Sequence, residues 1–184
     1  MTFPTFRRHQ FASRAFFDEF DLQGKYEPIG TPFISLNDQD RHYAVFKEAT
    51  ISPVGKDYVV EHMKLDDIRI LKQQLIAVGL TDETGRETAE LMIRKIRMKI
   101  YTRQWIIEAY VHLRAEEIPE DVLSVRRHDF FATSEARLSS AKIGESYEYH
   151  AKVMFINRDR VLFYHRVEAE NGSNGALGGS VPQV

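Results

Sequence analysis

Residues 86–117 read RETAELMIRKIRMKIYTRQWIIEAYVHLRAEE, and this stretch decides the fold that the sequence predicts. Thr84 and Glu87 have the spacing of a capping box, in which the two side chains satisfy free backbone N–H groups at a helix start. Pro119 stops such a helix, because the residue before a proline is biased away from helical conformation. We therefore expect one long helix over residues 86–117.

The apolar residues of this helix fall on two sides. One side carries Met92, Ile93, Ile96, Ile100, Ile107, Tyr110 and Val111, and the other carries Leu91, Met98, Trp105, Ala109 and Leu113. A helix that is apolar on two sides must be covered on two sides. We expect a sheet on one side and another helix or a second subunit on the other.

Two shorter helices are expected beside it. Phe6 to Phe20 has aromatic residues near helical spacing, so residues 1–22 are predicted to hold an amphipathic helix that docks on the body. Asp66 to Leu80 is predicted as a second helix, capped by Asp66 or Asp67.

Strands are expected on both flanks of the helices. About three are predicted within residues 26–63, and about three more from Val122 to Val167. The clearest alternation of apolar and polar residues runs from Tyr147 to Phe155 and again from Val161 to Val167, which predicts a hairpin. The predicted fold class is α+β, with an antiparallel sheet of about six strands wrapped on a long central helix.

Composition limits the function classes. The 184 residues suit a single domain, 1–184, in which we see no solenoid repeat, and residues 171–184 form a loose Gly-rich tail. The net charge of -2 favours neither nucleic acid nor an anionic membrane. The absence of cysteine excludes disulfides and thiolate metal sites. With no apolar run near 18 residues and no secretory signal, we expect a cytoplasmic protein without a membrane span.

Glu61, His62 and Asp66 are the candidate catalytic residues, because they lie where a strand gives way to the predicted second helix. An imidazole and a carboxylate there can share a proton or orient a water, and the helix start would polarise a carbonyl. The alternative is that Asp66 only caps the helix and His62 is an ordinary surface residue.

Tyr58, Arg126, Arg127 and His128 are the candidate substrate-binding residues. The arginines would hold a phosphate or carboxylate, and His128 beside Asp129 would supply a base. The alternative is a strand start with solvated charges. No metal site is predicted, because a third ligand for any histidine pair is missing, and no cofactor is predicted.

A basic band runs along the predicted long helix, formed by Arg94, Lys95, Arg97, Lys99 and Arg103. These cations would bind phosphates of a nucleic acid or nucleotide, or else only keep their charged ends in water while their stems cover the core. The near-neutral total charge favours the second interpretation.

The closing third of the chain resembles hot-dog-fold proteins that act on acyl thioesters. The residues that carry the resemblance are the segments Lys142–Tyr149, Val153–Arg158 and Val161–Val167, followed by Glu170-Asn171-Gly172. The resemblance implies a dimer or higher homo-oligomer that binds acyl-CoA or acyl-carrier-protein thioesters in a tunnel along the long helix. A thioester hydrolase is implied if the protein is an enzyme.

A second hypothesis comes from a different class. The chain would be a non-enzymatic regulatory or assembly module that binds a protein or nucleic-acid partner through a dimer and the basic helix face. Hydrolysis or binding of a long-chain acyl-CoA would separate the two hypotheses.

Overall fold

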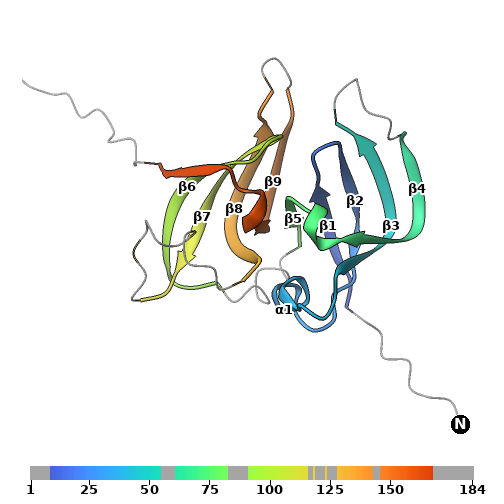
Figure 1. The fold of residues 1–184 in the computed structure, drawn as a ribbon, viewed down its shortest axis with the longest axis horizontal. Coiled ribbons are helices and arrows are strands. Elements are labelled where there is room, and N and C mark those ends of the chain that lie inside the picture. The colour runs from blue at the N-terminus through green and yellow to red at the C-terminus, as the bar shows by residue number, and fades with distance from the viewer. Residues whose placement is uncertain are drawn as a thin grey trace, which may run out of the picture.

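The computed structural model describes residues 9–54, 61–82, 91–115, 118, 123, 128–142 and 146–167, and nearly all regular secondary structure in these is strand (Figure 1). The elements in chain order are β1 Phe11–Phe16, β2 Phe20–Tyr26, α1 Pro32–Asn37, β3 Tyr43–Pro53, β4 Met63–Leu71, the 3-10 turn η1 Lys72–Gln74, β5 Ala77–Leu80, β6 Arg94–Tyr101, β7 Trp105–Leu113, β8 Phe130–Ser140, β9 Glu148–Asn157, the 3-10 turn η3 Arg158–Arg160 and β10 Phe163–Arg166.

The predicted long helix is wrong, because residues 94–113 form the antiparallel hairpin β6–β7. Every second residue of β7, from Trp105 to Leu113, is buried, which is the period of a strand with one covered face. Thr102 makes the turn: its backbone N–H donates to the carbonyl of Trp105 at 2.9 Å, and its hydroxyl accepts from the N–H of Trp105 at 3.0 Å. The predicted α+β, hot-dog-like fold class is therefore also wrong, because it depended on this helix.

The two shorter helices are also wrong. The segment Phe6–Phe20 contains β1 and the start of β2, and Asp66–Leu80 contains most of β4, η1 and β5. Conversely, residues 26–63 were expected to hold only strands, but they include the short helix α1, where the hydroxyl of Thr31 accepts from the N–H of Ile34 at 3.2 Å. The strands β3, β9 and β10 are confirmed, but β9 and β10 do not pair with each other.

All ten described strands form one antiparallel sheet in the order β10-β6-β7-β8-β9-β5-β1-β2-β3-β4. Figure 1 shows two groups, β6 to β10 on the left and β1 to β4 on the right, with β5 between them. Among the described residues one ladder joins the groups, β5 with β9, from Ala77 opposite Ile156 to Leu80 opposite Val153. We call this ladder the junction.

The two groups have the same topology. The first repeat, β1–β5, has the order β5-β1-β2-β3-β4, and the second, β6–β10, has the order β10-β6-β7-β8-β9. Each has a 3-10 turn before its last strand. The backbone bond from Ile76 N–H to the Phe16 carbonyl has its counterpart in the bond from Leu162 N–H to the Tyr101 carbonyl, both at 2.8 Å. The fold is therefore an internal duplication.

A matching bulge supports the duplication. Glu48 in β3 and Glu135 in β8 are the two described non-glycine residues with positive φ, at 49° and 51°, and each lies where the ladder register shifts. The surrounding sequences, KEATIS from Lys47 and SEARLS from Ser134, share Glu, Ala and Ser. A non-glycine residue in this conformation at the same place twice indicates a bulge built into the repeat.

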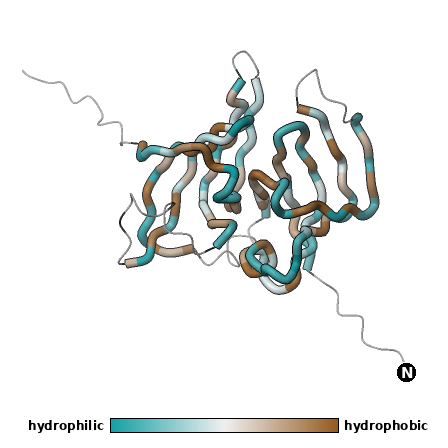
Figure 2. Tube along the Cα trace, viewed as in Figure 1, coloured by the Kyte–Doolittle hydropathy of each residue, from teal (hydrophilic) through white to brown (hydrophobic). Residues whose placement is uncertain are grey.

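Each repeat has its own hydrophobic core. The first core gathers mainly around β1–β4 and includes Tyr26 and Phe46, and the second gathers mainly around β6–β9 and includes Trp105. The junction strands supply both cores by alternation: Val78 and Phe155 belong to the first, and Ala77, Met154 and Ile156 beside them belong to the second. Figure 2 shows hydrophobic segments on strands of both groups, and all four residues of β5 are buried. The junction is therefore buried on both faces.

Candidate functional site

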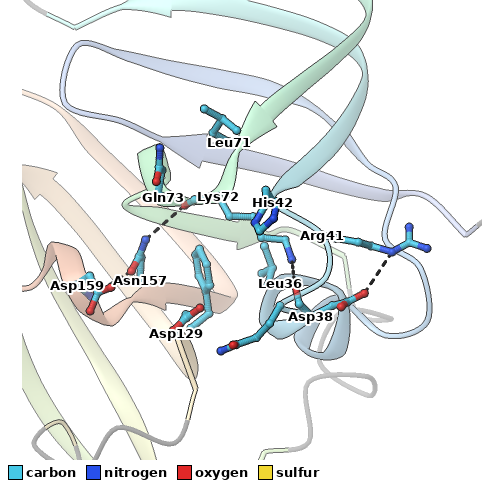
Figure 3. Close-up of a pocket in the computed structure, with 12 residues that line it drawn as sticks. Leu36, Asp38, Arg41, His42, Leu71, Lys72, Gln73, Asp129, Asn157 and Asp159 are labelled. Carbon is cyan, nitrogen blue, oxygen red and sulfur yellow. Dashed lines mark hydrogen bonds and ion pairs between the residues drawn. The ribbon is translucent and has the colours of Figure 1, made fainter.

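A polar cleft of about 550 Å³ opens where the turns of the two repeats meet (Figure 3). The loop after α1, the 3-10 turn η1, the start of β8 and the end of β9 line it. Its side chains include the carboxylates Asp38, Asp129 and Asp159 and the basic groups Arg41, His42 and Lys72. Three carboxylates therefore share the cleft with a guanidinium, an ammonium and an imidazole.

Lys72 is the buried cation of this cleft, with 8% of its surface exposed. Its Nζ donates to the backbone carbonyl of Asp38 at 2.8 Å, and its own N–H donates to the His42 carbonyl at 2.8 Å. Burial lowers the pKa of the Lys72 ammonium, an effect that Asp38 opposes. Such a group is a candidate for chemistry, but this ammonium is bonded to the backbone of the loop after α1.

Two asparagines fasten the walls of the cleft. Asn157 is buried and its Nδ2 donates to the carbonyl of Leu75 at 2.9 Å, which ties β9 to η1. Asn37 bonds to Phe130 with both ends of its amide, accepting from the N–H at 2.8 Å and donating to the carbonyl at 3.0 Å. The polar groups of the cleft thus mostly hold the repeats together. The sequence signals for these loops are the turn-forming residues Asn37-Asp38 and Asn157-Arg158, and nothing local predicts the contacts they make.

A buried carboxylate adds a second polar contact between the repeats. Asp21 is 2% exposed, and the guanidinium of Arg14 donates to both of its oxygens at 3.0 Å. The hydroxyl of Tyr147, from the second repeat, donates to the same carboxylate at 3.0 Å. A charge that is paired and fully hydrogen-bonded is the kind that burial tolerates, so this group is read as structural.

The two outermost strands, β4 and β10, present a different kind of site. They end the sheet on opposite sides, so each has one edge without a neighbouring strand among the described residues. Large apolar side chains are exposed on or beside these strands: Met63 at 39%, Leu71 at 48%, Leu162 at 65% and Phe163 at 56%. A free edge flanked by apolar side chains is a template for a further strand.

The predicted catalytic residues lie in β4 or just before it, and not at a helix start. Glu61 and His62 are exposed and precede β4, and Asp66 is exposed within β4. Nδ1 of His62 lies 3.3 Å from the hydroxyl of Ser52. None of the three lines the polar cleft. The helix dipole that was to assist them is absent, because residues 63–71 are a strand.

Of the predicted substrate-binding residues, Tyr58, Arg126 and Arg127 lie outside the described residues. His128 is exposed, with its ring edge-on to Phe33 at 5.1 Å between centroids. Its neighbour Asp129 lines the polar cleft, and His128 does not. The structure therefore does not join His128 to Glu61, His62 or Asp66 in one pocket.

The basic band lies on β6 and in the turn after it, and part of it is paired. Lys95 contacts Glu135 at 3.2 Å and lies over the ring of Tyr110 at 4.2 Å, and Arg97 forms an ion pair with Glu108. The helix face proposed for nucleic acid is thus wrong. Within the described part of the chain no group of three or more His, Asp or Glu residues could hold a metal ion.

Comparison of the chain with protein-family models, curated proteins and solved structures finds no match. The described residues contain no helix with the length and hydropathy needed to cross a membrane.

Proposed function

We propose that this chain is a non-enzymatic assembly module, which binds a protein partner by adding a strand to an open edge of its sheet. The observation that carries the proposal is the contrast in exposure between matching residues. Leu162 and Phe163 are 65% and 56% exposed, whereas their counterparts Ile76 and Ala77 in the first repeat are 1% and 0% exposed. The same backbone position is covered in one repeat and open in the other.

Strand addition suits these edges. Main-chain hydrogen bonds give the affinity in such contacts, and alternate side chains give the specificity. Exposed apolar residues also occur elsewhere on the described surface, for example Ile34 and Ile93, as is ordinary for a protein. Those on or beside β4 and β10 differ in lying at strands that end the described sheet. The sequence-based hypothesis of an assembly module assigned partner binding to a basic helix face. We assign it to the open edges of β4 and β10 instead.

Acyl-thioester binding stays a prediction. Its tunnel was to be lined by the helix over residues 86–117, and residues 94–101 and 105–113 are strands. In the polar cleft the cations are already engaged, since Lys72 donates to the carbonyl of Asp38 and Arg41 pairs with the Asp38 carboxylate. No observation on the described residues favours this function over assembly.

A synthetic peptide tests the proposal. A fluorescent peptide of residues 158–167, the η3–β10 segment, is titrated with the purified chain. We expect its anisotropy to rise and the amides of β4 to become protected from hydrogen exchange. The matched peptide with Tyr164→Pro and Arg166→Pro lacks two N–H groups of the added strand and is expected not to bind.

No anisotropy change with either peptide, together with unchanged exchange in β4, would contradict an edge that accepts strands. Hydrolysis or tight binding of a long-chain acyl-CoA by the same preparation would favour the thioester hypothesis instead.

A further inference from the structure

We infer that the partner is a second copy of this chain, bound head to tail, with β4 of one chain paired antiparallel to β10 of the next. The inference rests on the proposed function and names its partner. The template is the junction, in which the fourth strand of the second repeat, β9, pairs with the last strand of the first, β5. The remaining fourth strand, β4 of the first repeat, and the remaining last strand, β10 of the second, have no such pairing among the described residues.

The duplication fixes the register of this contact. The ladders align Asp67 with Val153 and Leu65 with Ala151, so β4 residues have β9 counterparts 86 positions later. The last strands show the same spacing. The internal pair of Ala77 with Ile156 therefore translates to the partner's Phe163 opposite Ile70, and Leu80 with Val153 translates to the partner's Arg166 opposite Asp67.

Backbone groups in this register are complementary. In the junction the N–H of Asn157 donates to the carbonyl of Ile76 at 2.9 Å. The translated bond runs from the N–H of Leu71 to the carbonyl of the partner's Leu162. Because every second N–H of a strand faces the same side, the N–H of Arg69 also faces outward.

One face of the new ladder is apolar. The partner's Phe163 and His165 would lie over Ile70 and Ile68, which pack on the first core. Phe163 is 56% exposed in the single chain. Covering it removes apolar surface from water, which is the general driving force of association.

The other face is charged and complementary. The partner's Arg166 would meet Asp67, whose carboxylate already pairs with Lys47 and lies 3.9 Å from Arg69. The partner's Tyr164 would meet the stem of Arg69. Charges on an edge strand can also serve to repel other strands, but here the opposed pair has opposite signs, which sets register and orientation.

This contact lacks one feature of the junction. Asn157, which bonds to η1, has Leu71 as its counterpart, so the side-chain bond to the turn is not repeated. The contact between chains is therefore weaker than the junction and reversible. A head-to-tail contact is heterologous, and it gives closed rings or open filaments depending on the rotation.

Two edge-blocking variants test the inference. Arg69→Pro removes an outward N–H from β4, and Arg166→Pro removes one from β10, at positions where proline is tolerated because the N–H faces solvent. We expect the wild-type chain to sediment as a concentration-dependent oligomer and each variant alone to sediment as a monomer. Mixed, the two variants are expected to give a one-to-one heterodimer and nothing larger, because each supplies the edge that the other has lost.

The heterodimer also shows that both variants are folded. Arg69→Ala, which keeps the N–H, is the matched control and should still form oligomers. A wild-type chain that stays monomeric at all concentrations would overturn the inference, and so would a homodimer formed by either proline variant alone. If the chain is monomeric but the β10 peptide still binds, the edge accepts strands and the partner is another protein, so only the self-association fails.

Discussion

The junction and the open edges are built from matching strands, yet they differ in burial. All four residues of β5 are buried, whereas three of four in its counterpart β10 are exposed. The last five residues of β9 are buried, whereas β4 has a single buried residue, Ile70. The backbone plan is therefore repeated, and the sequence decides which copies of it are covered.

The pattern of apolar and polar residues along each strand determines whether one or both of its faces are buried. Val153 to Ile156 is a continuous apolar run, as expected for a strand that is buried on both faces. The matching residues Asp67 to Ile70 alternate, as expected for a strand with one face in the core and one in water or against a charged partner. The comparison suggests three stability experiments besides the edge variants.

The largest loss of unfolding free energy is expected from substitution of the first residue of β7. Trp105 is fully buried and its Nε1 donates to the Phe17 carbonyl at 2.8 Å, whereas its counterpart Phe20 is only partly buried. Trp105→Ala should lower the free energy of unfolding by about 3–5 kcal/mol. Phe20→Ala should lower it by about 1–3 kcal/mol, because less apolar area is lost.

Denaturant unfolding followed by far-UV circular dichroism measures both, since Trp105 is the single tryptophan and its loss removes the fluorescence signal. Trp105→Phe keeps most of the packing and should cost less than Trp105→Ala. Equal losses for Trp105→Ala and Phe20→Ala would break the asymmetry between the two cores.

An intermediate loss of stability is expected from a substitution in the junction. A Cβ added at Gly79 would lie 2.8 Å from Cε1 of Tyr149 and 3.1 Å from Cβ of Ala151. Gly79→Ala should therefore cost about 1–3 kcal/mol of stability through overpacking. Its counterpart His165 is exposed at the edge, and His165→Ala should change the stability of the single chain by less than about 0.5 kcal/mol.

Thermal unfolding of the four combinations of Gly79→Ala and Tyr149→Ala shows whether the clash is the cause. If it is, the double variant loses less than the sum of the single variants. Additive losses would mean that Gly79 matters for another reason.

The failure of the helix prediction has a physical explanation. At about 100° per residue, alternating positions spread to both sides of a helix, so a strand with one apolar face resembles a helix that is apolar on two sides. Burial alternates strictly from Trp105 to Leu113, but the sequence also has Ile106 and Tyr110 at the intervening positions, which obscures the period of two. The alternation of residues 147–155 predicted β9 correctly because no helical period competed with it.

Pairing and burial at long range could not be predicted. The neighbours of β9 are β8 and β5, and β5 lies about seventy residues earlier in the chain, so nothing local identifies it. The short match between KEATIS and SEARLS is the one sequence sign of the duplication, and it is too short to recognise without the ladders. The polar cleft escaped prediction for the same reason, because Lys72 and Asp129 meet only after both repeats have folded.

The smallest effect is expected at Lys72, in alkaline solution. Burial lowers the pKa of this ammonium below its ordinary value of 10.5, with Asp38, Arg41 and Asp129 as the charged groups around it. A lysine whose pKa is lower in the folded state releases its proton before the unfolded chain does, so the unfolded chain binds more protons in that window. Stability therefore rises with pH between the lowered pKa and 10.5.

Lys72→Met removes this dependence. The wild type should therefore gain unfolding free energy relative to Lys72→Met as the pH rises through the window. The counterpart variant Arg158→Met is the matched control, because a guanidinium keeps its proton throughout this range, so its difference from the wild type should not vary with pH. A flat difference for Lys72→Met, measured by denaturant titration at successive pH values, would mean that the ammonium is solvated and that the cleft does not bury its charge.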